Sequence, residues 1–175
     1  MKIGVLAAGI TPDELIAEHG SYAQMIINLL NTTDTKFEFE IFDVRLDQFP
    51  KDLSQFDGWA ISGSKSNVSE NLPWMPKLKT LILDAYGAKQ PIVGICFGHQ
   101  IIADAFGGNV HRYEGGWGLG LHTYQLTPGY ESLIGDEKTF SINAVHQDQV
   151  INKPNNSEVI AHSDFCRNAG LIYGD

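Results

Sequence analysis

The residue of this sequence best suited to chemistry is Cys96, which stands between two glycines in Gly94-Ile95-Cys96-Phe97-Gly98. The run Pro91–Ile95 is apolar and rich in β-branched residues, which predicts a short strand buried on both faces. Beyond the cysteine, His99–Phe106 carries apolar residues at helical spacing, and Gly107-Gly108 supplies a stop. A strand, a Gly-x-nucleophile-x-Gly turn and a helix form a nucleophile elbow, here with cysteine in the place of serine.

Such an elbow favours the reactive thiolate form of Cys96. The N-terminus of the following helix presents unpaired N–H groups and a positive dipole end, and both stabilise a thiolate over a thiol. The N–H of Phe97 is placed to point at the oxyanion of a tetrahedral intermediate. The alternative is a buried structural cysteine, but such a cysteine does not need flanking glycines. The glycines allow a tight turn in which the nucleophile itself has a strained backbone.

A cysteine nucleophile needs a base, and the sequence offers six histidines. By chemistry alone His146 is the best internal candidate, because it follows a predicted strand and Asp148 lies two residues away. His99 lies in the same predicted helix as the elbow, where it is poorly placed to orient the thiol. The remaining four lie in or beside predicted helices and strands without a polar constellation: His19, His111, His122 and His162.

The first half of the chain alternates strands with helices long enough for parallel crossovers. We expect a sheet of four strands, over Lys2–Ala8, Phe37–Phe42, Asp57–Ser62 and Pro91–Ile95. The strand ending at Ser62 leads straight into the small residues Gly63 and Ser64, whose N–H groups could approach a ligand closely. The fold class is therefore α/β, Rossmann-like (flavodoxin-like), a mostly parallel sheet with helices on both faces.

The half after Gly108 is predicted to be rich in strands. Short strands are expected at Asn109–Tyr113, Leu119–Leu126, Thr139–Val145, Glu158–Ser163 and Gly170–Tyr173. Gly174-Asp175 then has the form of a hairpin turn with no strand after it to pair with the last one. A polar tail is one explanation of this ending, and a chain cut short is the other.

Composition limits the classes of function. With 175 residues and 43% hydrophobic content, we expect one domain over residues 1–175 with an ample core. A net charge of −9 with scattered Lys and Arg argues against nucleic-acid binding. Two cysteines 70 positions apart suggest neither a disulfide framework nor a metal site, and no apolar run reaches membrane-spanning length. A cytoplasmic protein that needs no cofactor of its own is expected.

The segment Gly94-Ile95-Cys96-Phe97-Gly98-His99-Gln100 resembles the nucleophile motif of the class I (triad-type) glutamine amidotransferases. Ile61-Ser62-Gly63-Ser64 resembles the oxyanion loop of that family, although many members have glycine and proline where this chain has Ser64-Lys65. The Gly-Gly-Trp turn near residue 116 and the segment His146–Asp148 also resemble family members, particularly free-standing ones and those akin to the amidotransferase domain of GMP synthetase. The resemblance covers nearly the whole chain.

The resemblance implies that ammonia is released from the side-chain amide of glutamine through a γ-glutamyl thioester on Cys96. It also implies an oxyanion hole made by the N–H of Phe97 and one from Gly63 or Ser64. The amino-acid end of glutamine would be held by Gln100 and by the segment of Ala144, Val145 and His146, so that His146 belongs to the pocket and is not the base. The implied partners are glutamine and either a synthetase or a separate ammonia acceptor.

The His-Pro-Glu motif that supplies the base in this family is absent from the 175 residues. In relatives it follows a hairpin like the one that Gly174-Asp175 opens, which would place it roughly ten residues beyond Asp175. We therefore expect a chain truncated before its catalytic histidine and glutamate and weak or inactive as written. The alternatives are a cysteine hydrolase of another γ-glutamyl amide, such as a γ-glutamyl peptide, and a non-catalytic binding or regulatory subunit of the same fold.

Overall fold

The computed structural model describes residues 1–135 and 137–174, and it divides into two compact units, Met1–Ala105 and Phe106–Asp175. None of the helices in this described part is long and apolar enough to cross a bilayer. The prediction that residues 1–175 form one domain stays a prediction, and each unit is described by itself below.

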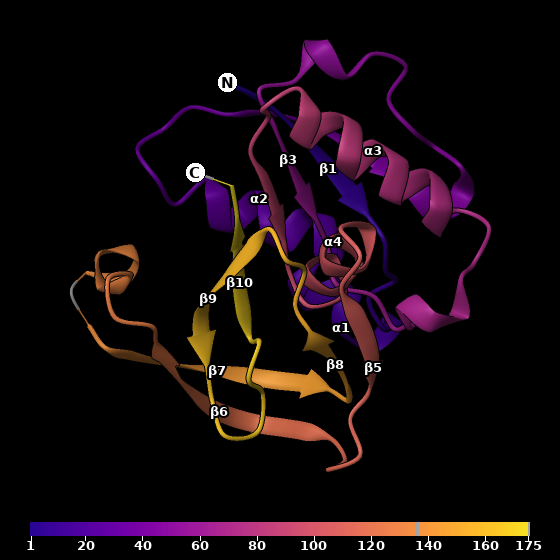
Figure 1. Ribbon diagram of the computed structural model, residues 1–175. Helices are drawn as coiled ribbons and strands as arrows, with labels where there is room; N and C mark the ends of the chain where they lie inside the picture. The colour runs from indigo at the N-terminus through magenta and orange to yellow at the C-terminus, as the bar shows by residue number, and fades with distance from the viewer. Residues whose placement is uncertain (136, 175) are drawn as a thin grey trace. The chain divides into compact units, whose positions relative to one another are not determined.

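The first unit is a parallel α/β layer structure (Figure 1). Its strands are β1 (Lys2–Ala7), β2 (Glu38–Asp43), β3 (Gly58–Ile61) and β4 (Ile92–Gly94). Its helices are α1 (Asp13–His19), α2 (Tyr22–Leu30), α3 (Met75–Gly87) and α4 (Phe97–Ala105). Single 3₁₀ turns lie between them at Val44–Leu46, Leu53–Gln55 and Val68–Glu70.

The parallel sheet has the strand order β2-β1-β3-β4. From β1 the chain crosses through α2 to one edge, and from β3 it crosses through α3 to the other edge. Right-handed crossovers in opposite directions put the two helices on opposite faces of the sheet, as Figure 1 shows. The predicted α/β class, with a mostly parallel sheet and helices on both faces, is confirmed.

The carboxyl ends of three adjacent strands lie at one edge of this sheet. Ala8 follows β1, Ser62 follows β3, and Cys96 comes two residues after β4. Because neighbouring parallel strands end at the same edge, the loops after β1, β3 and β4 are neighbours. This is the edge at which open α/β sheets bind ligands.

The strand before the elbow differs from its prediction. The run Pro91–Ile95 was expected to be buried on both faces, yet β4 covers only Ile92–Gly94 and the Val93 side chain is 60% exposed. In the described part of the chain, the reason is the place of β4 at the edge of the four-stranded sheet, where β3 is its one paired neighbour. A continuous apolar run therefore did not distinguish an edge strand from a central one.

The second unit is rich in strands, as predicted, and its strand pairs are antiparallel. They are β5 (Asn109–Arg112), β6 (Gly118–Leu126), β7 (Thr139–His146), β8 (Asp148–Asn152), β9 (Ser157–His162) and β10 (Gly170–Tyr173). A 3₁₀ turn at Glu131–Ile134 lies between β6 and β7. One sheet has the order β10-β9-β6-β7, and β5 and β8 form a separate two-stranded sheet. Figure 1 shows β6 and β7 as a long hairpin.

One strand of this unit differs from what the sequence predicted, and the last strand agrees with it. Strand β8 is not among the strands expected from the sequence; its residues Asp148 and Gln149 are buried, and it pairs with β5. The last strand, β10, is found as expected and pairs with β9, which precedes it. Gly174 has φ 76°, a backbone conformation typical of a turn.

Close packing of β1 against β3 gives a stability prediction. A Cβ added at Gly4 would overlap the six-membered ring of Trp59, which is buried against Phe42 and Phe56. The indole also donates from Nε1 to Gln90 Oε1 at 2.9 Å, so the ring has little freedom to move. Gly4→Ala is expected to lower the free energy of unfolding by about 1–3 kcal/mol, measured by urea denaturation.

The matched control is Gly87→Ala. Gly87 is the last residue of α3, and a Cβ there meets nothing within 4 Å. Alanine in a helix costs less backbone entropy than glycine, so the free energy of unfolding should be unchanged or rise by up to about 1 kcal/mol. Equal losses in the two variants would contradict the packing argument.

Candidate active site

The turn that carries Cys96 is tightly built. Cys96 has φ 55°, a left-handed conformation that is uncommon for a residue with a side chain. The strained backbone expected at the elbow is thus confirmed. The thiol is exposed, and α4 begins at the next residue, Phe97. The Gln100 N–H bonds to the Cys96 carbonyl at 3.1 Å, so the cysteine directly precedes the first turn of the helix.

The two glycines of the motif are required by backbone contacts. A Cβ at Gly94 would overlap the carbonyl group of Gly98 and lie 2.7 Å from the amide nitrogen of His99. A Cβ at Gly98 would lie 2.5 Å from the carbonyl oxygen of Ile61 in β3. The first turn of α4 therefore rests directly on β3 and β4, which is possible only without side chains at these two positions.

The loop after β3 lies beside the cysteine. A Cβ at Gly63 would be 3.7 Å from the Cβ of Cys96, so the two residues are in van der Waals range. The N–H of Ile95 donates to the carbonyl of Ile61 at 3.0 Å and holds the two chain segments in this register. The predicted residues Cys96, Phe97 and Gly63 are therefore brought together within the first unit, and Ser64 follows Gly63 in the same loop.

The N-terminus of α4 gives this site its polarity. Phe97, the first residue of the helix, has an N–H without an acceptor inside the helix, whereas the Gly98 N–H donates to the carbonyl of Ile95 at 2.9 Å. The Phe97 N–H and the helix dipole favour negative charge beside Cys96. Phe97 itself is buried, with its ring against Trp74 at 5.6 Å between centroids. Gln100, one turn further on, is also buried.

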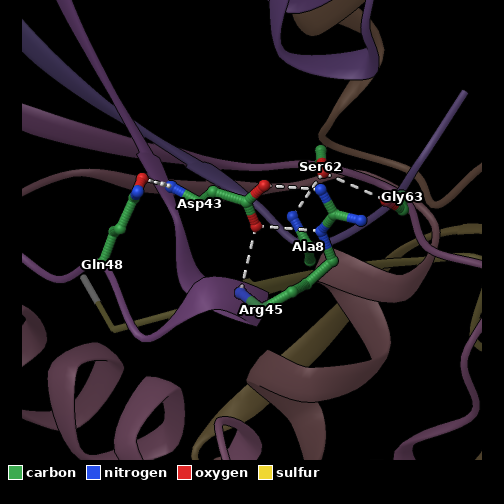
Figure 2. A network of polar contacts seen from close by, with 6 residues as sticks. All are labelled: Ala8, Asp43, Arg45, Gln48, Ser62 and Gly63. Atoms are coloured by element: carbon green, nitrogen blue, oxygen red, sulfur yellow. Dashed lines mark hydrogen bonds and ion pairs between the residues drawn. The ribbon is translucent and has the colours of Figure 1, made fainter.

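A polar network holds the adjoining strand ends (Figure 2). The Ser62 hydroxyl accepts a hydrogen bond from the Ala8 N–H at 2.9 Å and donates to the Gly63 carbonyl at 3.0 Å. At the end of β2, Asp43 receives two hydrogen bonds from the Arg45 guanidinium. Sequence reasoning placed Ser62 in the segment that resembles an oxyanion loop but gave it no role of its own.

The other predicted pocket residues lie in the second unit. Ala144, Val145 and His146 form the end of β7 and pair with Gly120, Leu119 and Gly118 of β6. Ala144 is buried, Val145 is exposed and His146 is half-buried. Side chains of alternating residues face opposite sides of a strand, so Ala144 and His146 share one face.

The partner of His146 is a backbone group, where the sequence suggested a carboxylate. Its Nδ1 lies 3.1 Å from the carbonyl oxygen of Asp148. A carbonyl only accepts, so Nδ1 carries the proton and the neutral ring has Nε2 as its acceptor. Nε2 faces Gly118, where a Cβ would lie 3.3 Å from it, and the ring packs edge-on against Phe165.

The remaining side chains bear on two further questions, whether metal ligands are grouped together and whether the second cysteine is reactive. Within residues 1–135 and 137–174, no group of three or more His, Cys, Asp or Glu side chains is arranged to hold a metal ion. The second cysteine, Cys166, is 5% exposed, and burial raises the pKa of its thiol to about 11. Cys96 is thus the accessible thiol of the described chain.

Comparison with known proteins gives three findings. The family model described as glutamine amidotransferase class-I matches residues 15–175. Gamma-glutamyl peptidase 4 of Arabidopsis thaliana is 33% identical over 164 residues, 89% of this chain and 64% of the peptidase. One subunit of the glutamine-hydrolyzing GMP synthase of Methanocaldococcus jannaschii is 40% identical over 100 residues, 54% of this chain and 50% of that protein.

A solved structure shares the fold. A glutamine amidotransferase from Thermotoga maritima superposes with a TM-score of 0.80 at 17% identity, covering 99% of this chain and 72% of that one. At this identity the likeness concerns the fold alone. The chain spans about two thirds of the length of the Arabidopsis peptidase and half that of the archaeal GMP synthase protein.

The two thiols should differ in reactivity toward a small alkylating reagent. At pH 8 only about one in a thousand Cys166 thiols would be ionised, since each pH unit below the pKa is a factor of ten. Iodoacetamide is therefore expected to modify Cys96 at least tenfold faster than Cys166, as measured by peptide mass spectrometry over time. The Cys166→Ser variant serves as control and should keep the full rate at Cys96. Comparable rates at both cysteines would refute the burial of Cys166.

The titration of His146 provides a second test. Burial lowers the pKa of His146 below its ordinary value, and His122 nearby adds to this, while the hydrogen bond to Asp148 and its charge act in the opposite direction. The ring should be neutral at pH 7. Because the unfolded chain binds the proton more tightly, folding stability should fall as pH drops through about 6.5 toward the lower folded pKa. NMR titration, with His146→Gln to assign the resonance, should give a midpoint below 6.5; a higher one would contradict the burial.

Proposed function

Because the chain belongs to the class-I glutamine amidotransferase family, we propose that Cys96 attacks the side-chain amide of glutamine and forms a γ-glutamyl thioester. The observation that supports this most is the positive φ of Cys96 between β4 and the N-terminus of α4, with Gly63 beside it. A strained, exposed cysteine at a helix N-terminus matches the requirements of a thiolate nucleophile.

The proposed reaction has two steps. The Cys96 thiolate adds to the amide carbon, and the oxygen becomes an oxyanion held by the N–H of Phe97 and one from Gly63 or Ser64. The carbon–nitrogen bond then breaks, the nitrogen takes up a proton, and ammonia leaves. Water hydrolyses the thioester to glutamate and regenerates the thiol. Ammonia passes to a synthetase partner or to a separate acceptor substrate.

Recognition of the substrate is assigned to the remaining predicted residues. Gln100 in α4 and the segment of Ala144, Val145 and His146 would hold the amino-acid end of glutamine. Support comes from the burial of Gln100 one turn from Cys96, and from the neutral His146 ring, whose Nε2 remains an acceptor. A side-chain amide can bond either an ammonium or a carboxylate group, whereas the Nε2 acceptor of the neutral His146 ring is suited to the ammonium group.

The base is the component that the 175 residues lack. No His-Pro-Glu sequence occurs in them, and a positioned general base contributes typically about 10²–10⁴ in rate. We therefore propose that the 175-residue chain forms the acyl-enzyme slowly. Its turnover of glutamine should lie far below the rate usual for enzymes, which is on the order of 10 per second.

A second candidate is hydrolysis of a γ-glutamyl peptide. It is favoured by the extent of the match: the Arabidopsis gamma-glutamyl peptidase aligns with 89% of this chain, whereas the archaeal GMP synthase protein aligns with 54%. The covalent chemistry on Cys96 would be the same, with an amine in place of ammonia as the leaving group. The two functions differ in the size of the leaving group that the site must accommodate.

The proposed function predicts a specific covalent adduct. A chloromethyl ketone analogue of glutamine should modify Cys96, with a carbon–sulfur bond formed and chloride released, and intact-mass and peptide mass spectrometry should find it there. Excess glutamine should slow the labelling, and a γ-glutamyl peptide should slow it more strongly if the peptidase function is correct. Cys96→Ser should take up no analogue.

Two outcomes would contradict this proposal. Labelling that glutamine and γ-glutamyl peptides both leave unchanged would mean that the site recognises no γ-glutamyl group, as expected for a non-catalytic subunit. Turnover of glutamine by the 175-residue chain at about 10 per second would mean that a base lies within it, and His146 would then be the first residue to substitute.

A further inference from the structure

The loop beside Cys96 is held by hydrogen bonds of one buried hydroxyl group, that of Ser62. Ser62 is fully buried, and its Oγ makes two of the hydrogen bonds drawn in Figure 2, one from the Ala8 N–H and one to the Gly63 carbonyl. The Ser62 N–H is itself bonded to the carbonyl of Leu6 at 3.1 Å. The ends of β1 and β3 are therefore joined through this side chain, at the point where main-chain pairing between them stops.

The same loop is shaped by the missing side chain of Gly9. A Cβ at Gly9 would overlap the carbonyl oxygen of Gly63 and lie 2.8 Å from the Cα of Ser64. Gly9 does not have a positive φ, so the need for glycine here comes from the close approach and not from the backbone conformation. The turn after β1 and the Gly63–Ser64 peptide are in direct backbone contact.

These two contacts fix the direction of one peptide plane. The carbonyl of Gly63 and the N–H of Ser64 belong to the same planar unit and point in opposite directions. With the Gly63 carbonyl bound to Ser62 and packed on Gly9, the Ser64 N–H is directed away from β1. The orientation of the Gly63–Ser64 peptide beside the Cys96 Cβ is thereby determined by residues that do not themselves reach the thiol.

We infer that Ser62 and Gly9 are positioning residues for the oxyanion of the reaction at Cys96. They act by holding the Gly63–Ser64 peptide in the orientation in which the Ser64 N–H meets the developing negative charge. This inference rests on the proposed function. Removal of a whole oxyanion donor costs about 10²–10³ in rate, and a donor that is present but free to turn should cost less, about tenfold or more.

The test compares two reagents that modify the same sulfur. In the glutamine chloromethyl ketone, the ketone oxygen occupies the place of the amide oxygen while the carbon–sulfur bond forms and chloride leaves. In methyl methanethiosulfonate, the Cys96 sulfur forms a disulfide bond and methanesulfinate leaves, with no carbonyl oxygen to stabilise. Only the first rate depends on an oriented oxyanion site, whereas both depend on the exposure and ionisation of the thiol.

Ser62→Ala and Gly9→Ala should each lower the second-order rate of the chloromethyl ketone by about tenfold or more, within the range that oxyanion donors contribute. Their rates with methyl methanethiosulfonate should stay within about twofold of the rate of the unsubstituted chain, because neither substitution changes the thiol itself. The two variants alter opposite sides of the same contact. In each of them the methyl methanethiosulfonate rate shows whether the thiol itself is affected by the substitution. The matched control is Ser157→Ala, another buried serine whose hydroxyl donates to a backbone carbonyl, that of Pro154 at 2.7 Å; it should change neither rate.

The contrary results are distinct. If both reagents slow equally in Ser62→Ala and Gly9→Ala, the two residues only support the fold and the inference is wrong. If the chloromethyl ketone reacts at the normal rate in both, the loop is positioned by other contacts and the inference is again wrong. If glutamine does not slow chloromethyl ketone labelling of Cys96 in the unsubstituted chain, the proposed function is wrong, and the inference that rests on it is wrong as well.

Discussion

The direct contact of the α4 backbone with β3 and β4 is the constraint on which the rest of the candidate site depends. Ordinary helices pack on sheets through side chains, but here Gly98 meets the carbonyl of Ile61, and Gly94 meets the first turn of the helix. This brings the positive end of the helix to the edge of the sheet and leaves Cys96 to make the turn with φ 55°. The strained backbone of Cys96 and its place at the helix N-terminus both depend on this close approach.

The elbow could be predicted from sequence because its requirements are local. Two glycines around one residue, a β-branched run before and a helical pattern after are visible in one short stretch of the chain, and the strained cysteine follows from them. The parallel arrangement of the first unit was equally accessible, since alternating strands and helices leave few other solutions. The strands of the second unit, although not their antiparallel pairing, were found from their turn residues, apart from β8.

What could not be predicted depends on contacts between distant parts of the chain. The exposure of Val93 follows from the position of β4 in the sheet, which the sequence of the strand does not encode. The role of Ser62 depends on Ala8 and that of Gly9 on Gly63, across more than fifty residues of sequence. His146 bonds to a backbone carbonyl because β8 begins at Asp148, a strand that lacks an alternating pattern clear enough to stand out.

The bond between the Ala8 amide and the Ser62 hydroxyl replaces what would otherwise be one more rung of the main-chain ladder between β1 and β3. A rung made by a side chain can be altered by exchanging one residue, whereas main-chain rungs cannot. The N-terminal strand and the loop at the thiol therefore share a connection that evolution or an engineer can loosen or tighten in a single step. A change near the start of the polypeptide can in this way be felt at a sulfur in the middle of the chain.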